Sequence, residues 1–114
     1  MNSERKYVAI SIKHTEYRWK FGMPCWLWGY HQTLQDEPRC FSGYTQYLSK
    51  AERYSVEDWE GHYSPTIVRR EPVSLSADLC KKWKEYDSVL VEAQQYEQYC
   101  KLAGIPLYPS EKES

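Results

Sequence analysis

The sequence predicts an α+β protein, with a mainly antiparallel sheet of three to five strands and two or three helices packed on one face of it. A length of 114 residues fits one domain. Segments in which apolar and polar residues alternate occupy the N-terminal half, a pattern typical of antiparallel strands. Stretches with helix-capping residues follow in the C-terminal half. We expect a single α+β domain over residues 1–108 and a flexible tail over 109–114.

The expected strands come first along the chain. In the first of them Val8, Ile10 and Ile12 share one face, as in a half-buried strand. The following connection is irregular and contains Gly22 and Pro24. The sheet is predicted as a meander in the N-terminal half, with strands at 7–13, 26–33 and 39–47, the connection at 14–25 and a turn at 34–38.

Helix signals dominate the second half. Ser49 and Ser55 each precede an acidic residue at the third following position, a spacing that resembles a helix N-terminus, and only Ser49, with Glu52, has the Glu of a capping box. From Ser55 we expect a helix of one or two turns anchored by Trp59 and stopped by Gly61. Further elements are a strand over 66–70, a helix from an N-cap at Ser76 to Tyr86, and a helix over 93–103 that turns Tyr96, Tyr99, Cys100 and Ala103 inward and ends at Gly104. Residues 87–91 fit a continued helix, but three consecutive aliphatic residues favour a short buried strand.

Charge and targeting signals limit the function classes. The formal net charge of −1 argues against the strongly basic surface of a typical nucleic-acid-binding protein. No apolar run is long enough to span a membrane, so no membrane partner is expected. The N-terminus leads directly into an alternating segment and shows no signal peptide, which predicts a cytoplasmic protein.

The spacing of the cysteines and histidines matches no catalytic or metal-binding motif. Cys25, Cys40, Cys80 and Cys100 lie far apart, which indicates reduced, buried thiols, although two disulfides stay open as an alternative. The histidines, His14, His31 and His62, lack the paired spacing of zinc ligands. On one strand Cys25 and His31 would be about 20 Å apart, too far for a nucleophile and its base. We therefore expect no metal, no cofactor and no enzymatic activity.

Aromatic residues provide the candidate site. They make up 16% of the chain and are almost all Trp and Tyr. Six of them fall between residues 17 and 30, in a region that continues a positively charged N-terminal arm. Exposed Trp, Tyr and Arg are typical of interface hot spots, whereas core packing is the alternative for each ring. The candidate protein-binding residues are Tyr17, Arg18, Trp19, Lys20, Phe21, Trp26, Trp28 and Tyr30.

Single-stranded nucleic acid is the alternative ligand. Arg18, Trp19 and Phe21 combine a cation with two rings, as a surface that stacks bases and contacts phosphates requires. Residues 81–84 (Lys-Lys-Trp-Lys) form a second basic spot. The overall charge favours the protein partner over the nucleic acid.

One stretch carries a family resemblance. Residues 41–59 resemble a pattern found in small phage and mobile-element proteins, in which an aromatic strand end precedes a short basic turn and an acidic helix capped by Ser or Thr. The matching residues are Lys50, Ala51, Arg53, Tyr54, Ser55 and Glu57. The resemblance implies a mobile-element origin. It also suggests the class of anti-CRISPR-like inhibitors, which bind a host protein such as a defence nuclease, and it assigns no functional residue.

Overall fold

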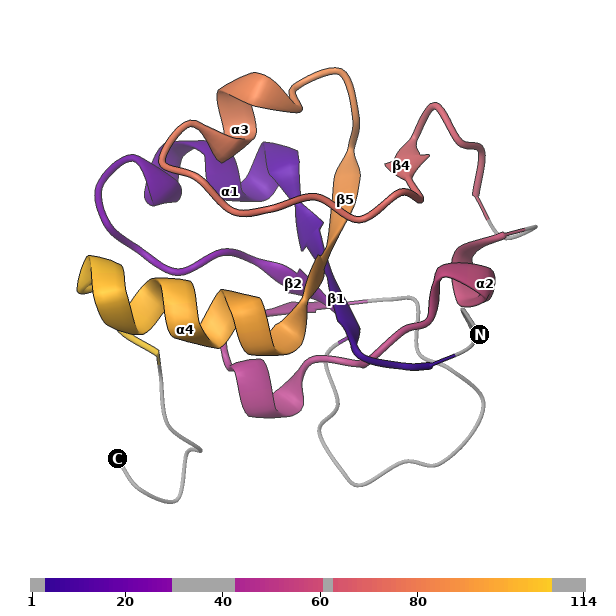
Figure 1. Ribbon diagram of the computed structural model, residues 1–114. Coiled ribbons are helices and arrows are strands. Elements are labelled where there is room, and N and C mark those ends of the chain that lie inside the picture. Colours follow the sequence, from indigo (N-terminus) through magenta and orange to yellow (C-terminus); the bar gives the residue numbers. More distant parts are fainter. Residues whose placement is uncertain (1–3, 30–42, 61–62, 108–114) are drawn as a thin grey trace.

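A computed structural model describes residues 4–29, 43–60 and 63–107, with the side chains of all these residues except Glu16 and Tyr17. One mixed five-stranded sheet with the strand order β3-β2-β1-β5-β4 runs through the molecule (Figure 1). The strands are β1 (Tyr7–Ser11), β2 (Leu27–Trp28), β3 (Tyr44–Thr45), β4 (Val68–Arg69) and β5 (Ser88–Glu92). The helices are α1 (Ile12–Trp19), α2 (Val56–Trp59), α3 (Leu79–Lys82) and α4 (Ala93–Ala103), with a 3-10 turn, η1, at Leu48–Lys50. The predicted α+β class is confirmed.

The two longest strands form the centre of the sheet. β1 pairs antiparallel with β5 along its whole length, from Tyr7 opposite Glu92 to Ser11 opposite Ser88. β4 pairs with β5 in parallel, so the sheet is mixed. The prediction that the sheet belongs to the N-terminal half is wrong, because β5 comes from the C-terminal half and lies beside the first strand (Figure 1).

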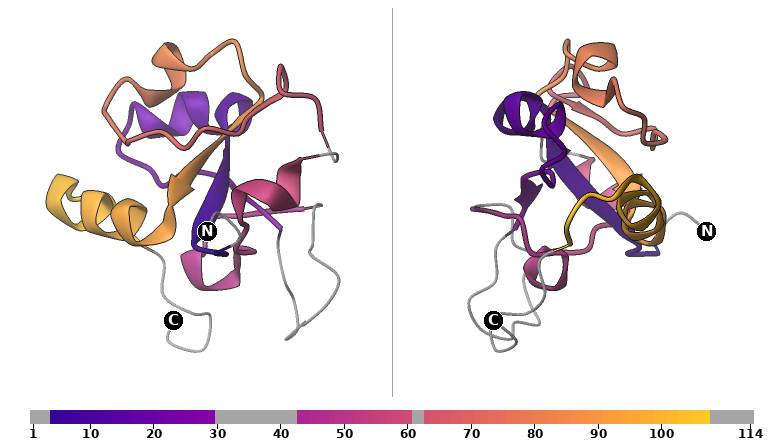
Figure 2. Two further views of the ribbon diagram at one scale, coloured as in Figure 1. Left: turned by 45° about the vertical axis from the view of Figure 1, so that its right-hand side comes forward. Right: turned by 90° about the vertical axis from the view of Figure 1, so that its left-hand side faces the viewer.

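Both faces of the central strands are covered. Val8 and Ile10 of β1 face a core that α1, α3 and α4 close with Trp19, Leu79 and Tyr96. Ala9 faces a second core on the opposite side of the sheet. That core also contains Tyr54, Trp59, Val68 and Leu90. Helix α2, which supplies Trp59, lies on the other side of the central strands from α4 (Figure 2). β1 is therefore buried on two faces and not on one.

The segment after β1 differs from its prediction. Where an irregular connection was expected over 14–25, the chain forms α1, and β1 ends at Ser11. The Ser11 hydroxyl accepts a hydrogen bond from the His14 backbone N–H at 3.4 Å and caps the helix. Ile12 still enters the first core. The strand therefore ends at the residue that caps the helix. The apolar pattern of 7–13 does not show this end, because Ile12 continues the alternation of apolar residues into the helix.

Of the predicted strands 26–33 and 39–47, the described parts contain the two-residue strands β2 and β3. The predicted turn at 34–38 lies outside the described residues, as do Cys40, Gly61 and the tail 109–114. The predicted strand 87–91 is confirmed as β5, whereas of the predicted strand 66–70 only Val68 and Arg69 form a strand, β4.

The helix predictions divide according to their capping signals. Ser55 opens α2 with a complete capping box, in which the Asp58 N–H donates to Ser55 Oγ at 3.2 Å and the Ser55 N–H donates to Asp58 Oδ2 at 2.8 Å. Ser49 lies inside the 3-10 turn and caps no helix, so that prediction is wrong.

Later in the chain, the helix expected from Ser76 to Tyr86 is shorter and begins at Leu79 after Asp78. α4 has its predicted bounds, and Gly104 ends it at φ +75°. Tyr96 and Cys100 are buried as expected, but Ala103 is exposed.

Candidate functional site

Trp19 joins α1 to the segment that precedes α3. Its indole Nε1–H donates to the Ser76 carbonyl oxygen at 2.9 Å. Its ring stacks against Tyr99 of α4 with centroids 5.7 Å apart. Trp19 is only 5% exposed, so it serves mainly as a structural contact between three elements. This contact brings residues near 20 beside residues near 80.

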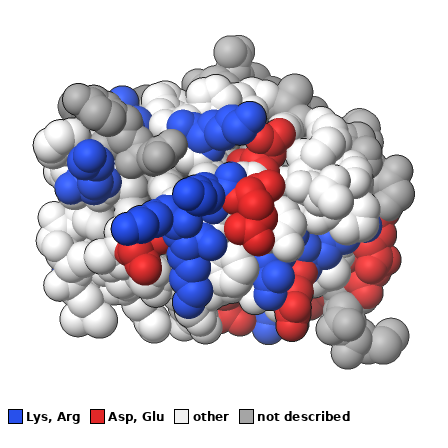
Figure 3. Space-filling model, turned by 90° about the horizontal axis from the view of Figure 1, so that it is seen from above, with Lys and Arg blue, Asp and Glu red and all other residues white. Residues whose placement is uncertain are grey.

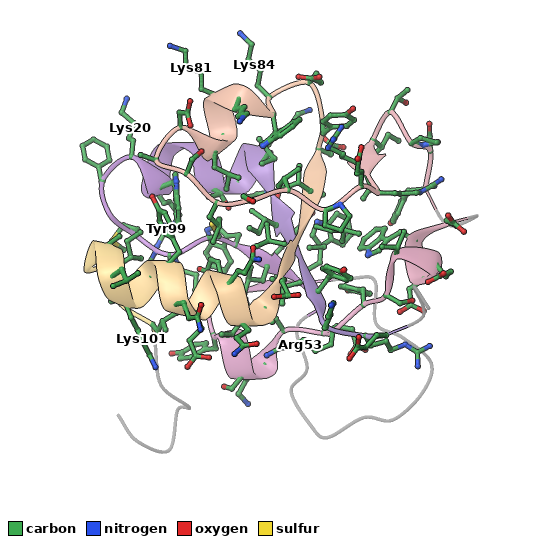
Figure 4. The ribbon with its side chains drawn as sticks, viewed as in Figure 1. Lys20, Arg53, Lys81, Lys84, Tyr99 and Lys101 are labelled. Carbon is green, nitrogen blue, oxygen red and sulfur yellow. The ribbon has the colours of Figure 1, made fainter. Side chains whose placement is uncertain are left out.

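A hollow of about 420 Å³ lies at this junction. We call it the lysine hollow, and its lining residues are Trp19, Lys20, Ala77, Asp78, Cys80, Lys81 and Lys84. Its volume falls in the range of about 300–1,000 Å³ that is usual for ligand pockets. Lys20, Lys81 and Lys84 project from the same side of the molecule, Lys20 from the end of α1 and the other two from α3 and the turn after it (Figure 4).

The lining is positively charged. Three lysines against one aspartate leave 3 − 1 = +2. Within residues 4–29, 43–60 and 63–107, neither Lys81 nor Lys84 forms an ion pair. Lys and Arg side chains gather on the face seen from above, with acidic side chains beside them (Figure 3). The net positive charge gives the hollow a preference for anionic groups.

A hydrogen bond from Ser76 fixes the Asp78 side chain in the lining of the lysine hollow. The Ser76 hydroxyl donates to Asp78 Oδ1 at 2.6 Å. This hydrogen bond, with the nearby charges of Lys82 and Lys81, lowers the pKa of the Asp78 carboxyl below its usual value. Asp78 is therefore ionised at neutral pH and offsets one of the three lysine charges.

Of the predicted binding residues, Lys20 and Phe21 lie on the surface at this end of the molecule. Phe21 is 64% exposed, and the Lys20 ammonium lies 5.8 Å from its ring centroid. An exposed ring next to a cation matches the aromatic and basic composition that the sequence predicted for the surface. Trp19 is also one of the lining residues of the hollow, and so three predicted residues meet there or beside it.

Arg18 and Trp26 form a separate pair. The Arg18 guanidinium lies 5.3 Å from the Trp26 ring centroid. With the side-chain amide of Gln46 turned so that its oxygen faces Arg18, both Arg18 Nε and Nη2 donate to that oxygen at 2.9 Å. These contacts hold Arg18 within the protein, away from the lining of the lysine hollow.

Trp28 lies in the second core. Its Nε1–H donates to Ser88 Oγ at 2.6 Å, and its ring meets Trp59 edge-on with centroids 5.4 Å apart. Because both faces of the sheet are covered, Trp28 and Trp19 are packed in different cores. Tyr30 and the Tyr17 side chain lie outside the described residues.

The sequence treated the two halves of the lysine hollow as separate features. The run at 81–84 marked Lys81 and Lys84 as a basic spot, but no spacing or motif connects that run to Lys20. Ala77, Asp78 and Cys80 carry no signal of their own, since they are ordinary residues at the start of a helix.

The buried thiols are poor nucleophiles. Cys25, Cys80 and Cys100 are buried and form no disulfide, as predicted. Burial raises the pKa of Cys25 well above its ordinary value, and burial raises that of Cys100 to about 11. The Cys25 N–H donates to the Tyr96 hydroxyl at 2.9 Å, which joins the loop before β2 to α4. These groups stabilise the core as neutral thiols.

A smaller hollow of about 210 Å³ contains a serine and a histidine. Ser11 Oγ lies 2.7 Å from His14 Nδ1, and the same oxygen accepts from the His14 backbone N–H. Ser11 is 3% exposed. The arrangement fits a helix cap, in which the serine oxygen satisfies groups of the first turn of α1.

Comparison with models of known protein families, with curated proteins and with solved structures found no match. Among the described residues, no group of three or more His, Cys, Asp or Glu side chains is arranged to hold a metal ion. No helix in the described part of the chain has the length and apolar character needed to cross a membrane.

Proposed function

We propose that this chain is a non-enzymatic interaction protein that binds an acidic region of a protein partner at the lysine hollow. The observation that carries the proposal is the convergence of Lys20, Lys81 and Lys84 around a partly apolar hollow, with Asp78 as the single opposing charge in its lining. Complementary charge steers association and selects partners, and a concave apolar surface adds contact area. Exposed Phe21 beside Lys20 extends the same surface.

The resemblance of residues 41–59 supports a more specific form of this proposal. A phage or mobile-element protein that binds and inhibits a host protein, such as a defence nuclease, would act in the cytoplasm. The groove in which a nuclease holds its substrate is lined by basic residues, so the partner's acidic region is expected away from that groove.

The alternative ligand, a single-stranded nucleic acid, uses the same cations. Stacking platforms require open ring faces. Among Arg18, Trp19 and Phe21, the Trp19 ring is buried and already stacked on Tyr99, and Arg18 packs on Trp26. These contacts favour a protein partner over nucleic acid.

A random peptide library displayed on phage tests the proposal, because it offers acidic, neutral and basic segments to the protein at the same time. We expect selection on the wild-type protein to enrich peptides rich in Asp and Glu. Their affinity should fall about tenfold in the double variant Lys81→Gln/Lys84→Gln, because each solvent-exposed ion pair contributes up to about 1 kcal/mol. The matched control is Lys6→Gln/Lys101→Gln, which removes the same charge outside the lysine hollow.

Two outcomes contradict the proposal. One is a selection that yields no acidic peptides, or peptides whose affinity is the same for the Lys81/Lys84 variant and the wild type. The other is tighter binding of a twelve-nucleotide oligothymidine than of any selected peptide, with an affinity that falls steeply as salt is raised.

A further inference from the structure

The composition of the lysine hollow specifies more than an anionic ligand. Its apolar lining residues are Trp19, Ala77 and Cys80, which we call its floor; Ala77 is exposed, and Trp19 and Cys80 are each 5% exposed. A purely anionic segment gains nothing from such a floor, since charged groups stay at the hydrated rim. An apolar side chain entering the hollow gains the free energy of leaving water.

The cations stand on two sides of this floor. Lys20 follows the last residue of α1, whereas Lys81 belongs to α3 and Lys84 to the turn after it. The three side chains extend outward in the same general direction, so a ligand that lies across the mouth of the hollow can contact all three (Figure 4). Carboxylates on both sides of an inserted side chain can reach them.

The floor is also held in position before any ligand arrives. The Trp19 indole is fixed by its hydrogen bond to the Ser76 carbonyl at 2.9 Å and by its stacking on Tyr99. Asp78 is fixed by the Ser76 hydroxyl at 2.6 Å. A site formed in advance loses less conformational entropy on binding, so an anchoring side chain would contribute more of its burial energy to affinity.

We infer that the lysine hollow binds an extended peptide segment in which one apolar side chain is flanked on both sides by carboxylates. The apolar side chain enters the hollow against Trp19, Ala77 and Cys80. The carboxylates on one side pair with Lys20, and those on the other side pair with Lys81 and Lys84. This inference rests on the proposed function and adds the chemistry of the segment that the site selects.

Synthetic peptides test the inference. The first has a central leucine between two pairs of glutamates, the second has serine in place of the leucine, and the third has glutamine in place of each glutamate. We expect the serine peptide to bind about tenfold more weakly than the leucine peptide, which corresponds to about 1.4 kcal/mol. The glutamine peptide should also lose about tenfold. Fluorescence anisotropy measures each dissociation constant.

Filling the hollow tests the placement of the leucine. Ala77→Trp occupies the hollow without changing charge, and Ala103→Trp adds the same ring at an exposed position of α4 outside it. We expect Ala77→Trp to reduce the affinity for the leucine peptide to that of the serine peptide, and Ala103→Trp to leave it unchanged. A ¹⁵N spectrum provides a second readout, in which the Trp19 indole signal, assigned with Trp19→Phe, shifts with the leucine peptide alone.

The outcomes separate this inference from the proposed function. Equal binding of the leucine and serine peptides, both weakened by Lys81→Gln/Lys84→Gln, overturns the apolar anchor and leaves the acidic-partner proposal standing. Binding of no peptide that contains glutamates overturns both. Retained discrimination between leucine and serine in Ala77→Trp places the anchor elsewhere and overturns the inference.

Discussion

Replacing Trp19 with phenylalanine should destabilise the protein by about 2–3 kcal/mol. The change removes the donor to the Ser76 carbonyl at 2.9 Å, and a lost hydrogen bond of this kind costs about 1 kcal/mol. It also removes part of a ring that is only 5% exposed, and the lost apolar burial with the space left behind adds about 1–2 kcal/mol. Together these effects correspond to a decrease in melting temperature of about 10 °C for a domain of this size.

Urea unfolding followed by far-UV circular dichroism measures the change in the free energy of unfolding. Phe21→Leu is the control, because Phe21 lies only two positions further along the chain but is 64% exposed, and its substitution should change stability by less than about 0.5 kcal/mol. A loss below about 1 kcal/mol for Trp19→Phe would refute the argument that this indole holds α1 against the segment before α3.

Three further perturbations test other parts of the structure. Burial alone would raise the pKa of Asp58, but the hydrogen bonds from Arg5 and Ser55 outweigh it and lower that pKa below the ordinary 3.8. Its ionised form therefore stabilises the fold above about pH 4, and this contribution is lost as the pH falls through the lowered value. The urea midpoint should consequently fall less steeply in Asp58→Asn than in the wild type as the pH is lowered from about 5 to about 3, a range that includes the usual Asp pKa of about 3.9. Parallel curves for the two proteins would contradict this. Because the pKa of Cys100 is about 11, only roughly one part in a thousand of it is thiolate at about pH 8. Iodoacetamide should therefore label Cys100, and likewise the buried Cys25, far more slowly in the native protein than in the unfolded protein. Labelling of either at the rate of a free thiol, measured by peptide mass spectrometry, would be inconsistent with the buried positions. Gly104→Ala should cost about 1 kcal/mol in urea unfolding through backbone strain alone, since Gly104 has φ +75° and an added Cβ meets no atom within 4 Å; unchanged stability would show that the C-terminus of α4 tolerates another conformation.

Elements with complete local signals were predictable from the sequence. α4 begins and ends where expected because its periodicity and Gly104 lie within one short stretch of chain. The cap of α2 was predicted at Ser55, although Asp58 completes a capping box there that the sequence had indicated only for Ser49 and Glu52. β5 was favoured by its three consecutive aliphatic residues. The two helices depend on contacts between residues that are close in sequence. The strand is buried on both faces, which requires a run of consecutive apolar residues that is visible in the sequence.

Elements whose signals overlap were misjudged. The alternation of Val8, Ile10 and Ile12 conceals the end of β1, since Ile12 is the first residue of α1 and still packs in the first core. Ser76 resembles an N-cap, but its hydroxyl donates to Asp78 and its carbonyl accepts from Trp19, and α3 starts later. The hydroxyl is used by a local partner, and the carbonyl is shared between the Leu79 N–H and the distant Trp19 indole, so Ser76 is not the N-cap of α3.

Local sequence patterns were enough to predict the α+β class, the cap of α2, the bounds of α4 and the concentration of aromatic and basic residues over 17–30. Which of these residues share a surface depends on the tertiary structure. It covers both faces of the sheet, so that Trp28 packs in one core and Trp19 in the other. It also joins Lys20 to Lys81 and Lys84 through the contact of Trp19 with Ser76, 57 residues away. Periodicity and capping record neighbours along the chain, whereas a binding surface depends on the packing of distant segments, which no local pattern encodes.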